Sequence, residues 1–359
     1  LGLVYLAGDL PLWFYRVWLT IQTVALYKTA VRTDVRPLGL RNSLVKVYHK
    51  EAMSQSRPEI REFLEPQQLG MSKAGAAKLV NSVRGLIHSR RDFVCIKIDL
   101  KHAFNEISRR SILETLESEP TLSHLSTFAA TILAPETEME TVGNRWGTSG
   151  QGVIQGDPPS GDLFDIGLQP SLVQLDSDCA ADGGAARGSH DDVCAIATLR
   201  AVQRFQQEVW ERCHLRLQWE KTQLFSWDGD LPDNVPEGIT LAGELLEGAL
   251  ERGFEIYGIA VGSDKFVSHK LQQKAEQIAK DAVQTADLLS ADRQALWHSL
   301  RLSISQRFGY FCQHTPPSLV EPVAEWLDNI IWRVLETATG FAIPRGEEAE
   351  MKVRCPVTG

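Results

Sequence analysis

The alternating pattern at residues 93–99 places the strongest constraint on the fold of this chain. Val94, Ile96 and Ile98 are separated from one another by small or polar residues. This period of two predicts a β-strand with one buried face. Asp99 comes at the end of the strand, and the aromatic Phe104 follows shortly after it. A carboxylate on a rigid strand end is well placed to hold a metal ion, although Asp also ends many strands in ordinary turns.

Further motifs follow this strand in a fixed order. Residues 155–160 read Gln-Gly-Asp-Pro-Pro-Ser, and the pair Asp191-Asp192 and then Lys221 come later. A strand-ending Asp, a Gln-Gly-Asp-Pro turn, an Asp pair and a later Lys resemble, in that order, the reverse transcriptase family. The likeness is greatest to the polymerases of non-LTR retrotransposons, and it covers roughly residues 26–340.

The charge of the chain is unevenly distributed. The 359 residues carry a net charge of −9, but residues 1–111 carry a local +9 and residues 112–261 a local −17. The basic N-terminal third predicts one face that can contact nucleic-acid phosphates, and a basic surface without any partner is the alternative. Because the acidic middle repels phosphates, nucleic-acid binding is expected to weaken strongly as salt rises.

The cysteines and the apolar N-terminal segment indicate where in the cell the protein is expected. The six cysteines are scattered without a Cys-x-x-Cys pair, which argues against a zinc module and a secreted disulfide scaffold. We therefore expect an intracellular location, the nucleus included. Residues 1–27 are apolar-rich, but Asp9, Pro11 and Arg16 interrupt them, so a buried helix is favoured and no membrane span is expected. The first residue is Leu1, as in a fragment of a longer protein.

Hydrophobic spacing predicts the order of helices and strands. Helices are predicted over 12–26, 43–64 with a break at Pro58, 72–89, 108–116, 122–133, 161–175 and 199–213. A hairpin is predicted over 26–38 with its turn near Thr33-Asp34, and strands over 140–145, 193–197 and 215–219. From the strand at 93–99 to the strand at 215–219, the predicted elements are a strand, helices, a hairpin, a helix and a strand, which is a βαββαβ order. This order predicts an α+β fold with an antiparallel sheet backed by helices.

The C-terminal third is predicted to be mainly helical. A hairpin is expected at 256–262, and helices near 266–289, 292–313 and 319–335, with Ser318 and Glu321 as a capping box for the last helix. The resemblance implies a right-hand polymerase with fingers at 1–90, to which part of 117–150 contributes. It further implies a palm at 91–261, a helical thumb at 262–340 and a loose C-terminal end at 341–359.

Nucleotide addition needs two divalent ions about 3.5–4 Å apart, which bind the attacking and leaving oxygens. Magnesium prefers oxygen ligands such as carboxylates. The resemblance implies that Asp99 and Asp191 hold two magnesium ions, for which manganese can substitute, with Asp192 in support. It places Lys221 near the leaving pyrophosphate, where a cation neutralises charge or donates a proton.

The resemblance also implies a substrate-binding set. Lys28 and Arg36 on the predicted hairpin would hold the triphosphate, since two cations on a short hairpin can clamp a polyphosphate. The nucleotide would further contact Leu100, Phe104, Gln155 and Gly156. An aromatic ring at Phe104 leaves no room for a 2′-hydroxyl, so deoxynucleotides are the expected substrates. The implied partners are an RNA template, a DNA primer and deoxynucleoside triphosphates.

The sequence departs from the family pattern beside the Asp pair. Family members usually place Tyr or Phe and a small apolar residue there, whereas this chain has Ser189 and His190, and the entering strand is poor in strand formers. Pro159 and Gly161 also stand where the family has Leu and Pro.

Three functions therefore remain open. An RNA-directed DNA polymerase is the first. A relic that keeps the fold and nucleic-acid binding but has lost catalysis is the second. An unrelated metal-dependent nuclease is the third, and it gives no role to Phe104 or to the Gln-Gly-Asp-Pro turn. The sequence contains no visible endonuclease, RNase H or zinc-knuckle pattern, and it predicts no oligomeric state.

Overall fold

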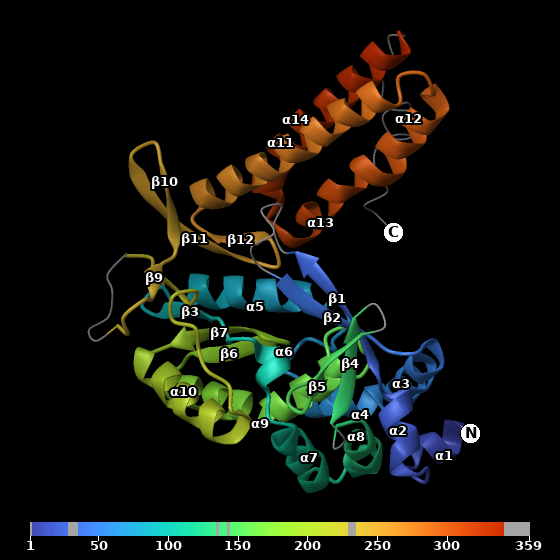
Figure 1. The fold of residues 1–359 in the computed structure, drawn as a ribbon. Helices are drawn as coiled ribbons and strands as arrows, with labels where there is room; N and C mark the ends of the chain where they lie inside the picture. The colour runs from blue at the N-terminus through green and yellow to red at the C-terminus, as the bar shows by residue number, and fades with distance from the viewer. Residues whose placement is uncertain (1, 28–34, 134–135, 142–143, 229–234, 341–359) are drawn as a thin grey trace. The chain divides into compact units, whose positions relative to one another are not determined.

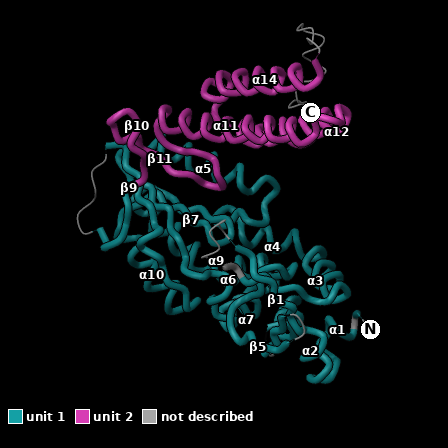
Figure 2. Tube along the Cα trace, turned by 45° about the horizontal axis from the view of Figure 1, so that its top comes forward, with its two compact units in different colours: residues 1–241 teal, residues 242–359 magenta. Residues whose placement is uncertain are grey.

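The computed structural model describes residues 2–27, 35–133, 136–141, 144–228 and 235–340 (Figure 1). The chain forms two compact units, residues 1–241 and 242–359 (Figure 2). The sequence predicted a palm–thumb boundary after residue 261, whereas the units divide between Leu241 and Ala242. The reason is that the strands of residues 243–262 pair with one another and pack against the following helix. The predicted fingers and the predicted palm up to Leu241 belong to unit 1, whereas residues 242–261 of the predicted palm belong to unit 2. The predicted loose end at 341–359 lies outside the described residues.

Unit 1 contains an α+β arrangement. Its elements are α1 (Gly2–Leu6), α2 (Leu12–Trp18), β1 (Ile21–Tyr27), β2 (Val35–Leu40), α3 (Ser43–Gln55), α4 (Arg57–Leu64), α5 (Gly75–Ser89), β3 (Val94–Ile98), α6 (Ala103–Glu106), α7 (Arg109–Ser118), a 3₁₀ turn (Ser123–Leu125), α8 (Ser126–Leu133), β4 (Thr137–Thr141), β5 (Asn144–Ser149), α9 (Ser160–Ala181), β6 (Ala185–Ser189), β7 (Asp192–Ala197), α10 (Leu199–Cys213), β8 (Gln223–Phe225) and β9 (Thr240–Leu241).

The central sheet of unit 1 has the strand order β6-β7-β3-β8-β9. Strand β3 pairs antiparallel with β7 and β8, and β6 pairs antiparallel with β7. Helices α5 and α9 contact β6 and β7, α10 contacts β7, and the three helices flank this sheet in Figure 1. The predicted α+β class and the helix-backed sheet are confirmed. The predicted antiparallel pairing holds for β6, β7, β3 and β8, whereas β9 pairs parallel to β8. Ile96 and Ile98 of β3 are buried as the alternation predicts, and Cys95 on the opposite face is buried too.

A second sheet, ordered β2-β1-β4-β5, lies where part of a helix was predicted. The predicted helix over 12–26 is wrong beyond Trp18, because Ile21 begins strand β1, which pairs with β2 on one side and with β4 on the other. The hairpin itself is confirmed, with Tyr27 opposite Val35, and its predicted turn lies outside the described residues. A hairpin of β4 and β5 replaces the single strand predicted at 140–145.

Other predicted elements differ at their boundaries. The break between α3 and α4 falls at Ser56, and Pro58 lies in the first turn of α4, where its missing N–H leaves no helical bond unmade. The strand predicted at 215–219 is wrong: it makes only an isolated bridge, Leu100 to Leu217, and β8 pairs with β3 instead. By contrast, α10 has the predicted bounds of residues 199–213.

Unit 2 combines a small antiparallel sheet with helices. Its elements are β10 (Gly243–Leu246), β11 (Ala249–Ile256), β12 (Ile259–Gly262), α11 (Asp264–Leu288), α12 (Arg293–Ser299), a π-helical turn (Leu300–Ile304), α13 (Gln306–His314) and α14 (Pro317–Thr339). The predicted hairpin at 256–262 is the β11–β12 pair. The predicted capping box is wrong, because α14 begins at Pro317 with Pro316 as its N-cap. Helices α11 and α14 pack along each other over a core that includes Leu271, Ile278 and Leu327.

Within the described part of the chain, the helices are too short or too polar to cross a lipid bilayer.

Candidate active site

A cavity of about 440 Å³ opens in unit 1 where β3, the β6–β7 turn and the start of α9 come together. We call it the acidic cavity. Its lining consists of Pro37, Asp99, Leu100, His102, Ala103, Phe104, Asn105, Gln155, Gly156, Asp157, Ser160, Gly161, Asp191, Gln218 and Lys221. Most of the site residues predicted from the sequence therefore meet in one place, although they come from segments far apart along the chain.

The remaining predicted residues lie elsewhere or outside the described parts. Asp192 is the first residue of β7 and does not line the acidic cavity. Arg36 lies in β2 opposite Leu26, beside the cavity residue Pro37, and its side chain is not among those described. Lys28 lies outside the described residues. Within the described ranges, no three His, Cys, Asp or Glu side chains form a group that could hold a metal ion, so the three predicted carboxylates do not make a complete ligand set by themselves.

The backbone of Asp99 is fixed on both of its sides. Ile98 lies opposite Val193, so Asp99 stands beside the start of β7. On the other side, the N–H of Asp99 donates to Thr222 Oγ1 at 3.3 Å, and the N–H of Gln218 donates to the Asp99 carbonyl at 2.8 Å. The segment that carries Lys221 is therefore tied to the strand end, although it forms no regular strand there.

The carboxylates near the cavity influence one another electrostatically. Burial raises the pKa of Asp191, and the neighbouring charges of Asp192 and Asp99 raise it further. Neighbouring carboxylates of this kind hold surplus negative charge in a confined space. Such a place favours a cation with oxygen ligands.

The turn that presents Asp191 is clamped by a side chain from a distant segment. The N–H of His190 donates to Gln68 Oε1 at 2.9 Å, and Gln68 Nε2 donates to the His190 carbonyl at 3.1 Å. Gln68 is buried, and the N–H of the next residue, Leu69, donates to the Gly188 carbonyl. The side-chain amide of Gln68 thus pairs with both backbone groups of His190, the residue that follows β6.

The ring of His190 attaches this turn to helix α9. Its Nδ1 lies 3.1 Å from Oδ1 and 3.0 Å from Oδ2 of Asp165, a fully buried residue of α9. Burial raises the pKa of Asp165 to about 6, against the opposing effect of His190. Burial lowers the pKa of His190, but the hydrogen bond to Asp165 and the charges of the nearby carboxylates together raise it above its ordinary value. Burial, and then the charge of Asp165, raise the pKa of nearby Asp162 to about 7.

The loop that brings Gln155 and Gly156 to the cavity packs directly on β2. The N–H of Gly39 donates to the Gln155 carbonyl at 2.8 Å. Gly156 has a φ of +102°, and a Cβ there would lie 2.8 Å from the Gly39 carbonyl oxygen. On the facing wall, Phe104 stacks on Phe164 with ring centroids 4.6 Å apart. Both walls are thus held by close packing.

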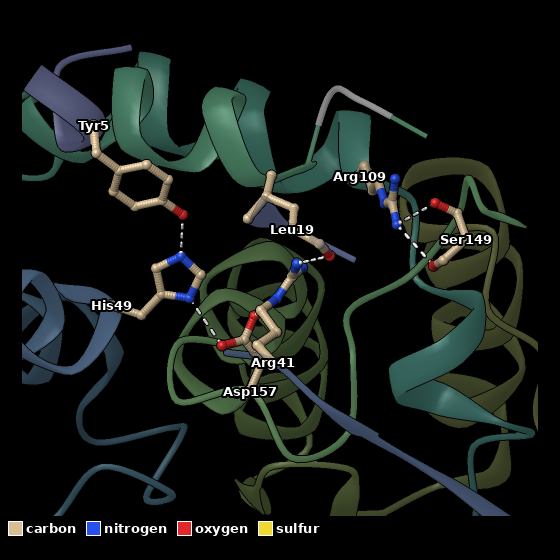
Figure 3. A network of polar contacts seen from close by, with 7 residues as sticks. All are labelled: Tyr5, Leu19, Arg41, His49, Arg109, Ser149 and Asp157. Carbon is tan, nitrogen blue, oxygen red and sulfur yellow. Dashed lines mark hydrogen bonds and ion pairs between the residues drawn. The ribbon is translucent and has the colours of Figure 1, made fainter. Parts of the chain in front are cut away.

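A buried polar network fixes the Asp157 carboxylate behind this loop (Figure 3). His49 Nδ1 lies 2.8 Å from Asp157 Oδ1, and Tyr5 Oη lies 2.7 Å from His49 Nε2. Arg41 Nε donates to Asp157 Oδ2, and Arg41 Nη1 donates to the Leu19 carbonyl. Burial alone would raise the pKa of Asp157, but the His49 hydrogen bond and the Arg41 charge hold it below its ordinary value. Asp157 is therefore an ionised acceptor that positions the turn.

A second arginine binds the loop from the other side. Arg109 donates to the carbonyls of Gly152, Leu133 and Ser149 at 2.8–3.1 Å, and Figure 3 shows its contact with Ser149. Burial lowers the pKa of Arg109 to about 10. Tyr5, Arg41, His49 and Arg109 carried no recognisable signal in the sequence, because their partners are loop atoms far along the chain.

This chain resembles known proteins in its structure and not in its sequence. A scan of protein-family models and a search of curated proteins both return no match. Solved structures similar to this chain include apo telomerase from Candida tropicalis, with a TM-score of 0.47 and 12% identity over 93% of this chain and 67% of that chain. Telomerase from Candida albicans in complex with a TWJ fragment of telomeric RNA has a TM-score of 0.46 and 10% identity over 96% of this chain and 65% of that chain.

A further likeness is to the apo Candida tropicalis telomerase truncated from its C-terminal domain, with a TM-score of 0.45 and 15% identity over 68% of this chain. The chain spans between 54% and 67% of the length of these three telomerase chains. The neighbours are telomerases, so the non-LTR affiliation stays a prediction from the sequence. At such TM-scores and identities, the chain's activity has to be inferred from its own residues.

Proposed function

We propose that this chain is a nucleotidyltransferase of the RNA-directed DNA polymerase type, which adds deoxynucleotides to a primer 3′-hydroxyl along an RNA template. The observation that carries the proposal is the acidic cavity, which gathers Asp99, Asp191 and Lys221 into one space of about 440 Å³. This volume falls within the range of small-molecule sites in proteins. In this proposal unit 1 contains fingers and palm, unit 2 contains the thumb, and the protein works inside the cell, the nucleus included.

Asp99 and Asp191 are the residues that would hold two magnesium ions, with manganese as a substitute and Asp192 behind them. The oxygen ligands fit this role, because both carboxylates line the cavity. Acidic neighbours help to raise the pKa of Asp191, and bound cations would reduce this repulsion between carboxylates. Magnesium is commonly held by one or two carboxylates, with substrate phosphates and water completing its ligands. When bound, the ions stabilise charge on the attacking and leaving oxygens.

The other lining residues have matching roles in the proposal. Lys221 has an exposed side chain at the cavity and would neutralise the departing pyrophosphate. Phe104, held by its stack on Phe164, would exclude a 2′-hydroxyl from the sugar position. Gln155 and Gly156 would contact the new base pair, Leu100 the nucleotide, and Lys28 and Arg36 the triphosphate. A metal-dependent nuclease would need no such aromatic wall.

The relic alternative depends on a defective turn before the Asp pair. The hydrogen bonds that His190 makes with the side chains of Gln68 and Asp165 hold this turn in place of the missing family residues. These contacts support retained chemistry over loss of catalysis.

Primer extension on an RNA template tests the proposal. The assay compares deoxy- with ribonucleotides in magnesium, for the wild type, Asp99→Asn and Asp92→Asn. Asp92 is the matched control, because its carboxylate is 71% exposed and does not line the cavity. We expect deoxynucleotide extension by the wild type and Asp92→Asn and none by Asp99→Asn. Extension that survives Asp99→Asn would remove the catalytic role of Asp99. A wild type that binds the primer–template but never extends it would establish the relic.

A further inference from the structure

Two positions where the sequence departs from the reverse transcriptase pattern touch each other in space. A Cβ atom on Gly161 would lie 3.3 Å from Cε1 of His190, tighter than most contacts of this kind. A Cβ on Gly70 would lie 2.7 Å from the same His190 atom and 2.6 Å from Asp165 Oδ2. The imidazole therefore packs closely against two residues that lack side chains, and a Cβ on Gly70 would overlap it. We call Gly70, Gly161 and Asp165 the His190 packing site.

The His190 packing site lies beside the very short connection between β6 and β7. Only His190 and Asp191 join β6, which ends at Ser189, to β7, which begins at Asp192. His190 adopts a left-handed conformation with a φ of +54°, which most side chains avoid and which His and Asn tolerate better. Because the connection is so short, a rotation of the His190 backbone would also turn Asp191 relative to the cavity.

The ring of His190 also reaches the nucleotide side of the site. Its centroid lies 6.3 Å from that of Phe104, and its side chain is about one-third exposed. The buried Asp165 holds the inner edge of the ring through Nδ1. The side chain of His190, the residue that precedes Asp191, is thus fixed between helix α9 and the aromatic wall.

We propose that His190 is a positioning residue, whose ring in the His190 packing site fixes the direction in which Asp191 faces the acidic cavity. Its effect on catalysis rests on the proposed function, whereas its effect on structure and on metal affinity does not. His190 and Gly161 are then a compensating pair. His190 is larger than the family residue at its position in the turn, and Gly161 in α9 is smaller than the family's Pro, which leaves room for the ring.

A double-mutant cycle in thermal unfolding tests the compensating pair. Gly161 lies in α9, where Ala normally stabilises a helix relative to Gly. We expect Gly161→Ala to leave unchanged or lower the melting temperature when His190 is present, and to raise it in the His190→Gly background. Gly85→Ala in α5 is the control, because a Cβ there meets nothing within 4 Å. It should raise the melting temperature equally in both backgrounds.

Manganese binding, measured by calorimetry or electron paramagnetic resonance, tests the positioning of Asp191. His190→Gly removes the ring but keeps a left-handed backbone unstrained, so the variant is expected to fold. We expect it to bind Mn²⁺ about tenfold or more weakly, as happens when residues that orient a ligand are removed. His190→Asn keeps a donor near the Nδ1 position and should restore most of the affinity. His214→Gly is the control, because His214 has a similar φ of +56°, but neither of the residues beside it in the chain lines the cavity, whereas Asp191 beside His190 does.

The primer-extension assay is then run on the same variants. For His190→Gly we expect a lower kcat with a nearly unchanged KM for the nucleotide, partial rescue by His190→Asn and no change for His214→Gly. If the wild type binds Mn²⁺ but extends nothing, the proposed function fails, while weaker binding by His190→Gly still supports the positioning role. If the wild type extends primers and His190→Gly matches it in Mn²⁺ affinity and kcat, or the Gly161 cycle is additive, the inference is overturned.

Discussion

His49 and Asp157 form a buried pair that joins helix α3 to the turn before α9, with Nδ1 of His49 2.8 Å from Oδ1 of Asp157. Both side chains are at most 2% exposed. Because an ionised carboxylate only accepts hydrogen bonds, His49 Nδ1 donates to it, which leaves Nε2 to accept from the Tyr5 hydroxyl. A single chain of contacts thus connects the N-terminal helix α1 with the wall of the acidic cavity.

Removing the nitrogens of His49 should destabilise the protein strongly. In His49→Phe the ring volume is kept, but the buried Asp157 carboxylate loses one of its two partners and Tyr5 loses its acceptor. We expect the free energy of unfolding to fall by about 3 kcal/mol, measured by urea titration. His88→Phe, at an exposed position of α5, should change it by less than about 0.5 kcal/mol. Equal stability of His49→Phe and the wild type would show that the network contributes nothing.

The sequence was informative where a local pattern decides the structure. The alternation of Val94, Ile96 and Ile98 predicted β3, and the spacing along residues 199–213 predicted α10 with its bounds. Burial follows the period of the apolar residues in α10, whereas in β3 Cys95 on the opposite face is buried as well as Ile96 and Ile98. The order of the motifs also predicted which residues would meet, and Asp99 and Asp191 do line one cavity.

Predictions failed where pairing or burial by another segment overrides the local pattern. Residues from Ile21 onward have apolar spacing that suits a helix, but antiparallel pairing with β2, and at Ile21 and Gln22 also pairing with β4, makes them a strand. The Ser318–Glu321 capping box was not formed, since Pro316 and Pro317 fix the start of α14 earlier. The contacts of Gln68, His49 and Asp165 depend on burial by distant elements, and no local pattern reveals them.

Asp162 should make stability depend on pH. Burial and the charge of Asp165 raise its pKa from 3.8 to about 7, so the folded state binds a proton that the unfolded state releases. The resulting stabilisation is complete below pH 3.8 and is lost as the pH rises to about 7. Relative to the wild type, Asp162→Asn should therefore gain stability across this window, by on the order of 4 kcal/mol.

Urea unfolding at several pH values between 3.5 and 8 measures this gain. The control is Asp92→Asn, which removes a carboxylate that is 71% exposed instead of a buried one. The stability of Asp162→Asn should still depend on pH in part, because burial also raises the pKa of Asp165, to about 6. A pH-independent difference between Asp162→Asn and the wild type would mean that Asp162 is not a protonated group in the folded protein.

Phe104 should decide between deoxy- and ribonucleotides, if the proposed function holds. Phe104→Val removes the ring from the cavity wall and opens space beside the sugar. We expect the ratio of ribo- to deoxynucleotide incorporation to rise by about 10-fold to 200-fold, the range that small changes in pocket size produce. Steady-state extension with single nucleotides measures it. Phe63→Val removes a similar ring outside the cavity and should leave the ratio unchanged. An unchanged ratio in Phe104→Val would exclude the steric role.

Gly156 should tolerate no side chain, whereas Gly147 in the neighbouring strand β5 should. At Gly156 the φ of +102° disfavours a Cβ atom, and that atom would also lie 2.8 Å from the Gly39 carbonyl oxygen. At Gly147 a Cβ meets nothing within 4 Å. We expect Gly156→Ala to lower the free energy of unfolding by about 2–3 kcal/mol and Gly147→Ala to change it by less than about 0.5 kcal/mol, both measured by urea titration.

The same pair of variants separates packing of the Gln155 loop from catalysis. Because the Gln155 carbonyl accepts from Gly39 N–H, a side chain at Gly156 should push the loop away from β2 and move Gln155 out of place. Under conditions where both variants are fully folded, Gly156→Ala should raise the KM for the nucleotide, while Gly147→Ala should match the wild type. If Gly156→Ala kept both its stability and its KM, close backbone packing between β2 and this loop would not be what shapes the cavity.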